Sequence, residues 1–448
     1  MKLRSIASLP VVIAGLLLST IAVRAADQPI GLDARLAQPV MKSGEKQQNY
    51  LRIALNGCKP ERTDRTPVNV AFVIDRSGSM NGQRIAQARE AAIMAVSRLD
   101  GNDTAAVVIF DDKVDVLIEA RNVSDPGYFT DQIRQIGVRG STAIYAGVQE
   151  GANQVRRFKD PRRLNRVVLL SDGLANVGPS QPAHFAQLGR DLLREGISVS
   201  TIGLGRDYNE DLMQQLARAS DGNHAFASAP NDLIQIFNRE FNDVLAACAQ
   251  TVAIDVDLKP GVRVVRALSR DGTIEDGRAA FQLNQVYAAT EHYVLLELEF
   301  DGSNPAALQD FGRVNVAYTV PDTGARATME TAIRGRFSAS KDEITAGLDQ
   351  TVFESVVEQV TRERAQQAVS LRDQGRRDEA AKLFQLNVSE IGAYFANGGK
   401  PSPALEALRS QYGLASSNAA AAAPGQWNEQ RKMLRQLDSQ GAGVGSRY

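Results

Sequence analysis

The sequence predicts an α/β fold in which a doubly wound, mostly parallel sheet is inserted in a β-sandwich, with a C-terminal helical hairpin. Three observations support this prediction. Between residues 68 and about 246, short strands that are apolar on both faces alternate with helical patterns, which is typical of a parallel sheet covered on both sides. Segments with the period of half-buried strands lie before and after this region. Residues 342–396 then carry a helical pattern.

These changes of pattern divide the chain into six segments. A polar linker that ends in Pro67 separates the first alternating strand, 50–55, from the α/β region. Pro-Gly and Asp-Gly turns break the later β-rich segment, and Gly375 separates two helices. We expect the Ala- and Gly-rich end to be disordered apart from a short helix around Trp427. The predicted segments are a signal peptide 1–25, an N-terminal strand segment and linker 26–67, an α/β domain 68–247, a β-sandwich domain 248–337, a helical hairpin 338–397 and a low-complexity tail 398–448.

The composition and the first residues indicate an exported protein. Lysine and arginine number 51 and aspartate and glutamate 52, so there is no basic excess to favour a nucleic-acid partner. The N-terminus has a positive start, an apolar stretch and small residues at the cleavage positions, as secretory signal peptides do. The alternative, an uncleaved membrane anchor, needs about 20 apolar residues, and Pro10 and Ser19 interrupt the stretch. We therefore predict a periplasmic or secreted protein without a transmembrane segment after signal cleavage.

Oxygen-bearing side chains lie in three loops of the α/β region, two of which directly follow predicted strands. Asp75 ends the first strand, and Ser77 and Ser79 follow it in DRSGSM. Thr142 lies in the loop GSTAIYAG before a helix, and Asp172 ends the strand in LLSDG. Because ligands bind at the carboxyl ends of the strands in such sheets, we expect these five side chains to converge there.

Two carboxylates and three hydroxyls suit a hard divalent cation. Mg²⁺ prefers six oxygen ligands at about 2.1 Å and keeps some water, and the lack of a nearby His or Cys disfavours zinc. We predict Mg²⁺, with Mn²⁺ or Ca²⁺ as alternatives. Neutral hydroxyls leave the ion able to accept one more anionic oxygen, such as the Asp or Glu carboxylate of a protein partner. A second acidic cluster, Asp111, Asp112 and Asp115, is interpreted as a solvated hairpin turn rather than a calcium site.

The order of these residues resembles the metal-ion-dependent adhesion site of von Willebrand factor type A domains. The resemblance covers residues 68–247 and includes the order of strands and helices. It implies that Asp75, Ser77, Ser79, Thr142 and Asp172 bind the ion directly or through water. It also implies that the last helix of the domain, about 231–246, shifts between two affinity states. The family often has Thr where this sequence has Ser before Asp172, but that position is not itself a ligand.

The flanking segments carry weaker resemblances. The strand segment before the domain and the β-rich segment after it are similar to bacterial secreted proteins related to inter-α-trypsin inhibitor heavy chains and calcium-activated chloride channel regulators. Residues 368–384 look like one tetratricopeptide-type hairpin. A second copy at the 34-residue period is missing, which favours an ordinary helical hairpin.

The two cysteines, Cys58 and Cys248, lie on either side of the α/β domain. The ends of an inserted domain must lie close together, so that the strand before it and the strands after it can share one sheet. We therefore predict a disulfide between Cys58 and Cys248, which an oxidising compartment permits. Two separate buried thiols are the alternative.

The predicted function is divalent-metal-dependent binding of a protein partner in the cell envelope, as an adhesion or scaffold protein and not an enzyme. The three histidines, His184, His224 and His292, form no HExxH motif, and no GxSxG or GxxxxGK[ST] motif is present. A metal-dependent hydrolase would need a general base near the ion, which the sequence does not show, and it is a remote alternative. The nearer alternative is a structural envelope-assembly protein whose metal site only stabilises the fold.

Overall fold

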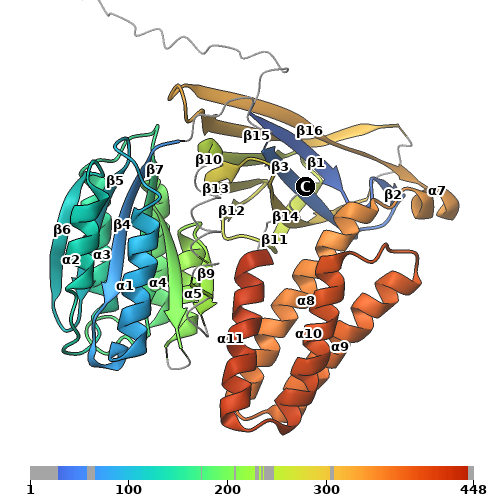
Figure 1. Cartoon of the computed structure of the whole chain (residues 1–448). Helices are drawn as coiled ribbons and strands as arrows, with labels where there is room; N and C mark the ends of the chain where they lie inside the picture. The colour runs from blue at the N-terminus through green and yellow to red at the C-terminus, as the bar shows by residue number, and fades with distance from the viewer. Residues whose placement is uncertain are drawn as a thin grey trace, which may run out of the picture.

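The computed structural model describes residues 29–57, 66–172, 174–205, 208–227, 232, 233, 236, 247–302 and 307–441. It has three parts: an α/β domain, a β-sandwich beside it, and a set of C-terminal helices (Figure 1). The predicted signal peptide lies outside the described residues, and so does most of the predicted helix 231–246. No helix in the described part of the chain is long and apolar enough to cross a membrane.

The α/β domain is a six-stranded sheet with helices on both faces. Its strand order is β6-β5-β4-β7-β8-β9, and all neighbouring pairs are parallel except β5 and β6. The inner strands are buried because α1 and α2 pack on one face and α3, α4 and α5 on the other. The elements are β4 Val68–Asp75, η2 Gly78–Met80, α1 Gln83–Val96, β5 Thr104–Phe110, β6 Val114–Asn122, α2 Pro126–Arg134, α3 Ile144–Arg156, β7 Leu164–Ser171, α4 Pro182–Arg194, β8 Ser198–Leu204, α5 Glu210–Ala219 and β9 His224–Ala227. The predicted doubly wound sheet is confirmed.

The β-sandwich consists of two sheets that share one apolar core. One sheet has the order β1-β3-β14-β11 and the other the order β12-β13-β10-β15-β16-β2. The strands are β1 Ile30–Leu36, β2 Val40–Lys42, β3 Gln47–Gly57, β10 Ala247–Leu258, β11 Val262–Ala267, β12 Thr273–Glu275, β13 Arg278–Tyr287, β14 Glu291–Phe300, β15 Gln309–Thr319 and β16 Arg326–Ser338. Because β3 precedes the α/β domain and pairs with β14, which follows it, the α/β domain is an insertion in the sandwich, as predicted.

The two ends of the insertion meet at the turn between β13 and β14. Gly57, at the end of β3, accepts a hydrogen bond from the backbone N–H of Ala289 at 3.0 Å. Ala247, at the start of β10, pairs with Tyr287, which lies two residues before Ala289. The strands that lead into and out of the α/β domain therefore end beside one another.

The predicted disulfide involves the residues next to these two strand ends. Cys248 is buried in the sandwich core, whereas Cys58 lies outside the described residues. The pairing therefore stays a prediction. Peptide mapping of the exported protein under non-reducing conditions tests it, and two separate thiols would contradict it.

The C-terminal part forms more helices than the sequence predicts. The expected hairpin is present as α8 and α9, with Gly375 at a positive φ of 84° between them. The disorder predicted for the tail from residue 398 is wrong, because α10 and α11 form there and their Tyr412 and Trp427 pack against Phe384 of α9. The short helix predicted around Trp427 is present as part of α11. The helices are α7 Lys341–Ala346, α8 Gln350–Asp373, α9 Arg377–Ala396, α10 Pro403–Ala421 and α11 Pro424–Gly441.

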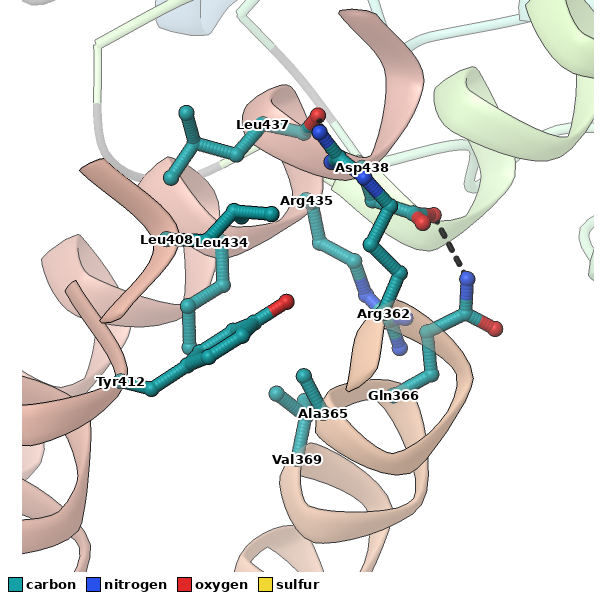
Figure 2. Close-up of a pocket in the computed structure, with 10 residues that line it drawn as sticks. All are labelled: Arg362, Ala365, Gln366, Val369, Leu408, Tyr412, Leu434, Arg435, Leu437 and Asp438. Atoms are coloured by element: carbon teal, nitrogen blue, oxygen red, sulfur yellow. Dashed lines mark hydrogen bonds between the residues drawn. The ribbon is translucent and has the colours of Figure 1, made fainter. Parts of the chain in front are cut away.

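Helix α11 connects the helical part to the α/β domain. It lies against α5 and β9 (Figure 1). Gln214 of α5 and Gln366 of α8 both donate hydrogen bonds to Asp438 of α11, at 2.8 and 2.7 Å. Figure 2 shows the pocket beside this contact. Its volume is about 10 Å³, room for about one water molecule, so it is too small for a ligand.

Candidate functional site

The predicted site residues lie at the edge of the sheet where the parallel strands end. Asp75 is the last residue of β4, and Asp172 directly follows the neighbouring strand β7. Both carboxylates are fully buried. Ser77 is buried and Ser79 is exposed in the loop and short 3₁₀ turn after β4. The site therefore has a buried floor and an opening to solvent at Ser79.

A chain of hydrogen bonds joins four of the five predicted residues. Asp75 Oδ1 accepts from the backbone N–H of Ser77 at 2.8 Å, the turn by which an aspartate commonly ends a strand. The hydroxyls of Ser77 and Ser79 lie 3.0 Å apart. Ser79 Oγ then donates to Asp172 Oδ1 at 2.8 Å. Two carboxylates from neighbouring strands are thus connected through the backbone N–H of Ser77 and the hydroxyls of Ser77 and Ser79.

Thr142 is held beside this chain through its loop. The backbone N–H of Gly78 donates to the carbonyl of Gly140 at 3.1 Å, which ties the loop after β4 to the loop before α3. Asn176, after β7, accepts from the N–H of Thr142 at 2.7 Å and donates its own N–H to the carbonyl of Thr142 at 3.2 Å. Thr142 is 3% exposed and lies between the loops that carry the other four residues.

The buried carboxylate of Asp75 has neutral hydrogen-bond partners. They are the N–H of Ser77 at 2.8 Å and the hydroxyl of Ser171 at 2.5 Å. Burial raises the pKa of Asp75 from 3.8 to about 6, although these hydrogen bonds act in the opposite direction. A cation placed near Asp75 would favour its ionised form and lower this pKa.

Three further residues contact the site, and the sequence did not predict them as its members. Ser171 donates to Asp75, Asn176 holds Thr142, and Arg84 of α1 pairs with Asp172 Oδ2 at 2.5 Å. Ser171 is adjacent to a predicted ligand and could have been found from the strand pattern. Arg84 and Asn176 carried no signal, because only the folded loops bring them to the site.

The hairpin turn predicted at the acidic cluster is present between β5 and β6, and Asp112 and Asp115 are exposed, but Asp111 is not solvated. Asp111 is fully buried, and its Oδ2 pairs with Arg76 Nε at 2.8 Å and with Arg139 Nε at 2.7 Å. Although burial raises it, the hydrogen bonds from Arg139 and Lys113 and the charge of Arg76 lower the pKa of Asp111 to about 2. Asp115 is half exposed and pairs with the same two arginines. The prediction was wrong for Asp111 because both arginines come from the loops of the candidate site.

The donor set at this edge fits a hard cation only if hydroxyls take part. Among the described residues, no group of three or more His, Cys, Asp or Glu side chains could hold a metal ion. Asp75 and Asp172 supply two carboxylates, and Ser77 and Ser79 supply hydroxyls linked to them. Such an all-oxygen set matches the ligand preference of Mg²⁺, with water completing the coordination.

Comparisons with known proteins agree with the predicted resemblance. Residues 69–239 match the family model described as von Willebrand factor type A domain. An uncharacterized protein of Synechocystis sp. is 25% identical over 287 residues, which cover 62% of this chain and 67% of that protein. Inter-alpha-trypsin inhibitor heavy chain H3 of Rattus norvegicus is 31% identical over 179 residues, which cover 38% of this chain. The aligned part spans only 20% of the length of that heavy chain.

A solved structure shares the architecture of nearly the whole chain. The structure described as von Willebrand factor type A from Catenulispora acidiphila aligns with a TM-score of 0.74 at 16% identity, over 95% of this chain and all of that one. At this identity the likeness shows the fold alone. The α/β domain, the sandwich and the C-terminal helices thus form an arrangement found in another protein.

Proposed function

Because this chain carries a von Willebrand factor type A domain, we propose that it is a non-catalytic, divalent-ion-dependent protein-binding protein of the cell envelope. Domains of this family are typically protein-binding modules. Asp75, Ser77, Ser79, Thr142 and Asp172 would hold the ion, most readily Mg²⁺. When bound, the ion supplies an electrophilic centre for an Asp or Glu carboxylate of the partner protein. The periplasmic or secreted location follows from the predicted signal peptide.

The observation that carries this proposal is the hydrogen-bonded chain from Asp75 to Asp172. It places two buried carboxylates and two hydroxyls at one edge of the sheet, and one of those hydroxyls, on Ser79, is exposed. Asp75 has neutral hydrogen-bond partners, so a divalent ion would stabilise the ionised form of a carboxylate that burial otherwise disfavours. The residues of this chain position the oxygens, and four of the five candidate ligands are buried.

The position of the site in the molecule favours access by a partner. Pro321 and Asp322 of the sandwich line a groove together with Thr66 and Arg162, at the starts of β4 and β7. The sandwich therefore contacts the edge at which these strands begin. Asp75 lies at the opposite end of β4, so the candidate site faces away from the sandwich.

Three arginines lie at the rim of the site, each paired with a carboxylate. Arg76 and Arg139 lie beside the loops of the site, and Arg84 is one-third exposed next to Asp172. Asp111 and Asp115 neutralise part of this charge. A partner carboxylate that approaches the ion could contact Arg84, the partly exposed guanidinium beside Asp172.

A retention experiment tests partner binding. Immobilised wild-type protein would be exposed to envelope extract in Mg²⁺ and in chelator, beside Asp75→Ala and the control Asp131→Asn, a change at a 74% exposed carboxylate. We expect a protein that is retained only with Mg²⁺, by wild type and control but not by Asp75→Ala. The purified partner should then bind at least about tenfold more weakly in chelator. Equal affinity with and without the ion would contradict the proposal.

The same experiment separates the proposal from the alternatives. If Mg²⁺ raises the melting temperature while a purified partner binds equally well in chelator, the site only stabilises the fold. A metal-dependent hydrolase remains the remote alternative. It would need a general base within hydrogen-bond reach of a reacting water. The hydrogen-bonding side chains beside Asp75 and Asp172 are hydroxyls and a guanidinium, which are poor bases.

A further inference from the structure

A second polar site lies where the α/β domain meets the sandwich. A cavity of about 70 Å³, here called the junction cavity, opens between the two parts. The α/β domain contributes Arg218 and Asp221, from the end of α5 and the turn after it. The sandwich contributes Arg270, before β12, and His292, on β14. The cavity is far from the sheet edge that carries Asp75, and its use does not depend on the proposed function.

His292 is the least satisfied side chain of the junction cavity. It is only 7% exposed, and neither of its ring nitrogens has a hydrogen-bond partner among the described residues. Its ring lies 6.1 Å from that of Tyr287, measured between centroids. Buried polar groups are almost always hydrogen-bonded, so a buried imidazole with two unused nitrogens beside a cavity indicates a missing polar partner.

The arginines of the junction cavity also have unused donors. Arg270 pairs with Asp221 Oδ1 at 2.5 Å through one terminal nitrogen, but its buried Nε–H has no acceptor among the residues that the structure describes. The buried Nε–H of Arg218 has no acceptor within the described part of the chain either, and its Nη2 lies 3.8 Å from Asp271 Oδ1. The other oxygen of Asp221, Oδ2, accepts the backbone N–H of Asn284 at 2.6 Å. The unused hydrogen-bonding capacity thus consists largely of donors.

We propose that the junction cavity binds a small inorganic oxyanion, of the sulfate or phosphate class, held by Arg218, Arg270 and His292. Three arginines and two aspartates line the cavity, so its charge favours an anion. A cavity that holds one water measures about 10–15 Å³, and the junction cavity is several times larger, which suits a tetrahedral anion but not a larger organic molecule. The anion would bridge the two parts and stabilise their contact.

Protonation of His292 should be linked to this binding. Burial lowers the pKa of His292 to about 4, so the side chain is neutral near pH 7. An anion beside it favours the protonated form and raises this pKa, and the anion should therefore bind more tightly as the pH falls from 7.5 to 6. The charged and titratable groups that face His292 are Arg166, Arg218, Asp221, Arg270, Asp271 and Tyr287.

Calorimetric titration of the full mature chain with sodium sulfate tests the proposal, since sulfate keeps its charge over this pH range. Ionic strength would be held constant with chloride. We expect saturable binding that is tighter at pH 6 than at pH 7.5. Arg218→Gln should weaken it at least about tenfold, since a charge-assisted hydrogen bond is lost. The matched control Arg134→Gln, at a 64% exposed arginine on α2, should bind as wild type does.

Nitrogen NMR gives a second readout that does not depend on a variant. The chain has three histidines, so the His292 ring signals can be assigned by substitution of the other two. Sulfate should shift the His292 ring nitrogens and leave those of His184 unchanged. Absence of saturable heat above the chloride control, equal affinity in Arg218→Gln and wild type, or an unmoved His292 signal at saturating sulfate would each overturn the proposal and leave a cavity that holds water only.

Discussion

Two buried carboxylates of the α/β domain differ in how the fold compensates their charge. Glu210, at the start of α5, is 4% exposed and accepts from Lys432 Nζ at 2.8 Å and from Arg431 Nε at 2.6 Å, both on α11. Asp75, at the end of β4, is fully buried and accepts from the N–H of Ser77 and the hydroxyl of Ser171. One carboxylate thus has cations supplied by the chain itself, and the other has neutral donors.

The pKa values show the consequence of this difference. Although burial raises it, the hydrogen bond and charge of Lys432 and the charge of Arg431 leave the pKa of Glu210 below its ordinary value. Burial raises the pKa of Asp75 to about 6. At the contact between α5 and α11, Lys432 and Arg431 compensate the charge of Glu210. Asp75 has neutral donors and lies at a solvent-facing edge of the sheet, so we infer that an external ion compensates its charge.

The largest effect should follow from removal of the internal cation. Lys432→Met leaves Glu210 buried with Arg431 alone, and we expect a loss of about 3 kcal/mol in the free energy of unfolding. Urea unfolding at pH 7.5 measures it, with the exposed Lys400→Met as control. The pKa of Glu210 is lowered in the folded state, so this contribution is present above its unfolded value of about 4.5 and is lost as pH falls through the lowered value. A loss below about 1 kcal/mol would contradict the comparison.

Neutralisation of Asp75 should increase the free energy of unfolding in chelator, whereas removal of Lys432 should decrease it. In chelator at pH 7.5, Asp75→Asn should increase the free energy of unfolding by about 1–3 kcal/mol, because the raised pKa of Asp75 is a cost of keeping it ionised. As pH falls through 6 towards 4, wild-type Asp75 takes up its proton and the advantage should disappear. The exposed Asp131→Asn is the matched control. A destabilised Asp75→Asn in chelator would show that the fold already compensates this charge.

Loss of one hydroxyl should weaken ion binding without change in buried charge. Ser79→Ala removes the group that donates to Asp172 and contacts the hydroxyl of Ser77. We expect about tenfold weaker Mg²⁺ binding by calorimetry, equivalent to about 1.4 kcal/mol. Ser417→Ala, at an exposed position on α10, serves as the control. Unchanged affinity would remove Ser79 from the ligand set.

The smallest effect is expected at the rim. Arg84 pairs with Asp172 and is one-third exposed, so its charge is partly screened by solvent. Arg84→Gln should tighten Mg²⁺ binding by about two- to fivefold, because a positive charge near the ion is removed. Arg134→Gln, far from the site on α2, should leave the affinity unchanged. Weaker binding in Arg84→Gln would mean that Arg84 positions Asp172 instead of competing with the ion.

The meeting of Asp75 and Asp172 could be predicted from the sequence, but the ion pair of Glu210 with Lys432 could not. Asp75 and Asp172 follow strands that are apolar on both faces, and parallel strands end at a common edge, so their meeting could be predicted. Glu210 meets Lys432 only because α11 forms and packs on α5. A short helix was expected around Trp427, but neither its full length, Pro424–Gly441, nor its packing on α5 was expected. The apolar surface against which α11 packs, such as that of Phe384 on α9, lies in other elements and could not be read from the local pattern.

The buried ion pairs around the site show the same limit. Asp111 was expected in a solvated turn, yet Arg76 and Arg139 reach it from two loops that are distant in the sequence. The local sequence pattern predicts the strand and the turn, but it does not predict which side chains from distant parts of the sequence contact them. His292 illustrates this too, since its place in a strand could be predicted and its position beside the junction cavity could not.

Electron paramagnetic resonance with Mn²⁺ tests the central claim most directly, since the signal of the free ion decreases when the ion binds. Wild-type protein should bind Mn²⁺ with a stoichiometry near one and lose it to excess Mg²⁺. Asp75→Asn, which keeps the size and hydrogen-bonding shape of the residue, should leave the free-ion signal unchanged, whereas Asp131→Asn should behave as wild type does. Equal Mn²⁺ binding by wild type and Asp75→Asn would contradict the claim that the buried charge of Asp75 is compensated by a divalent ion.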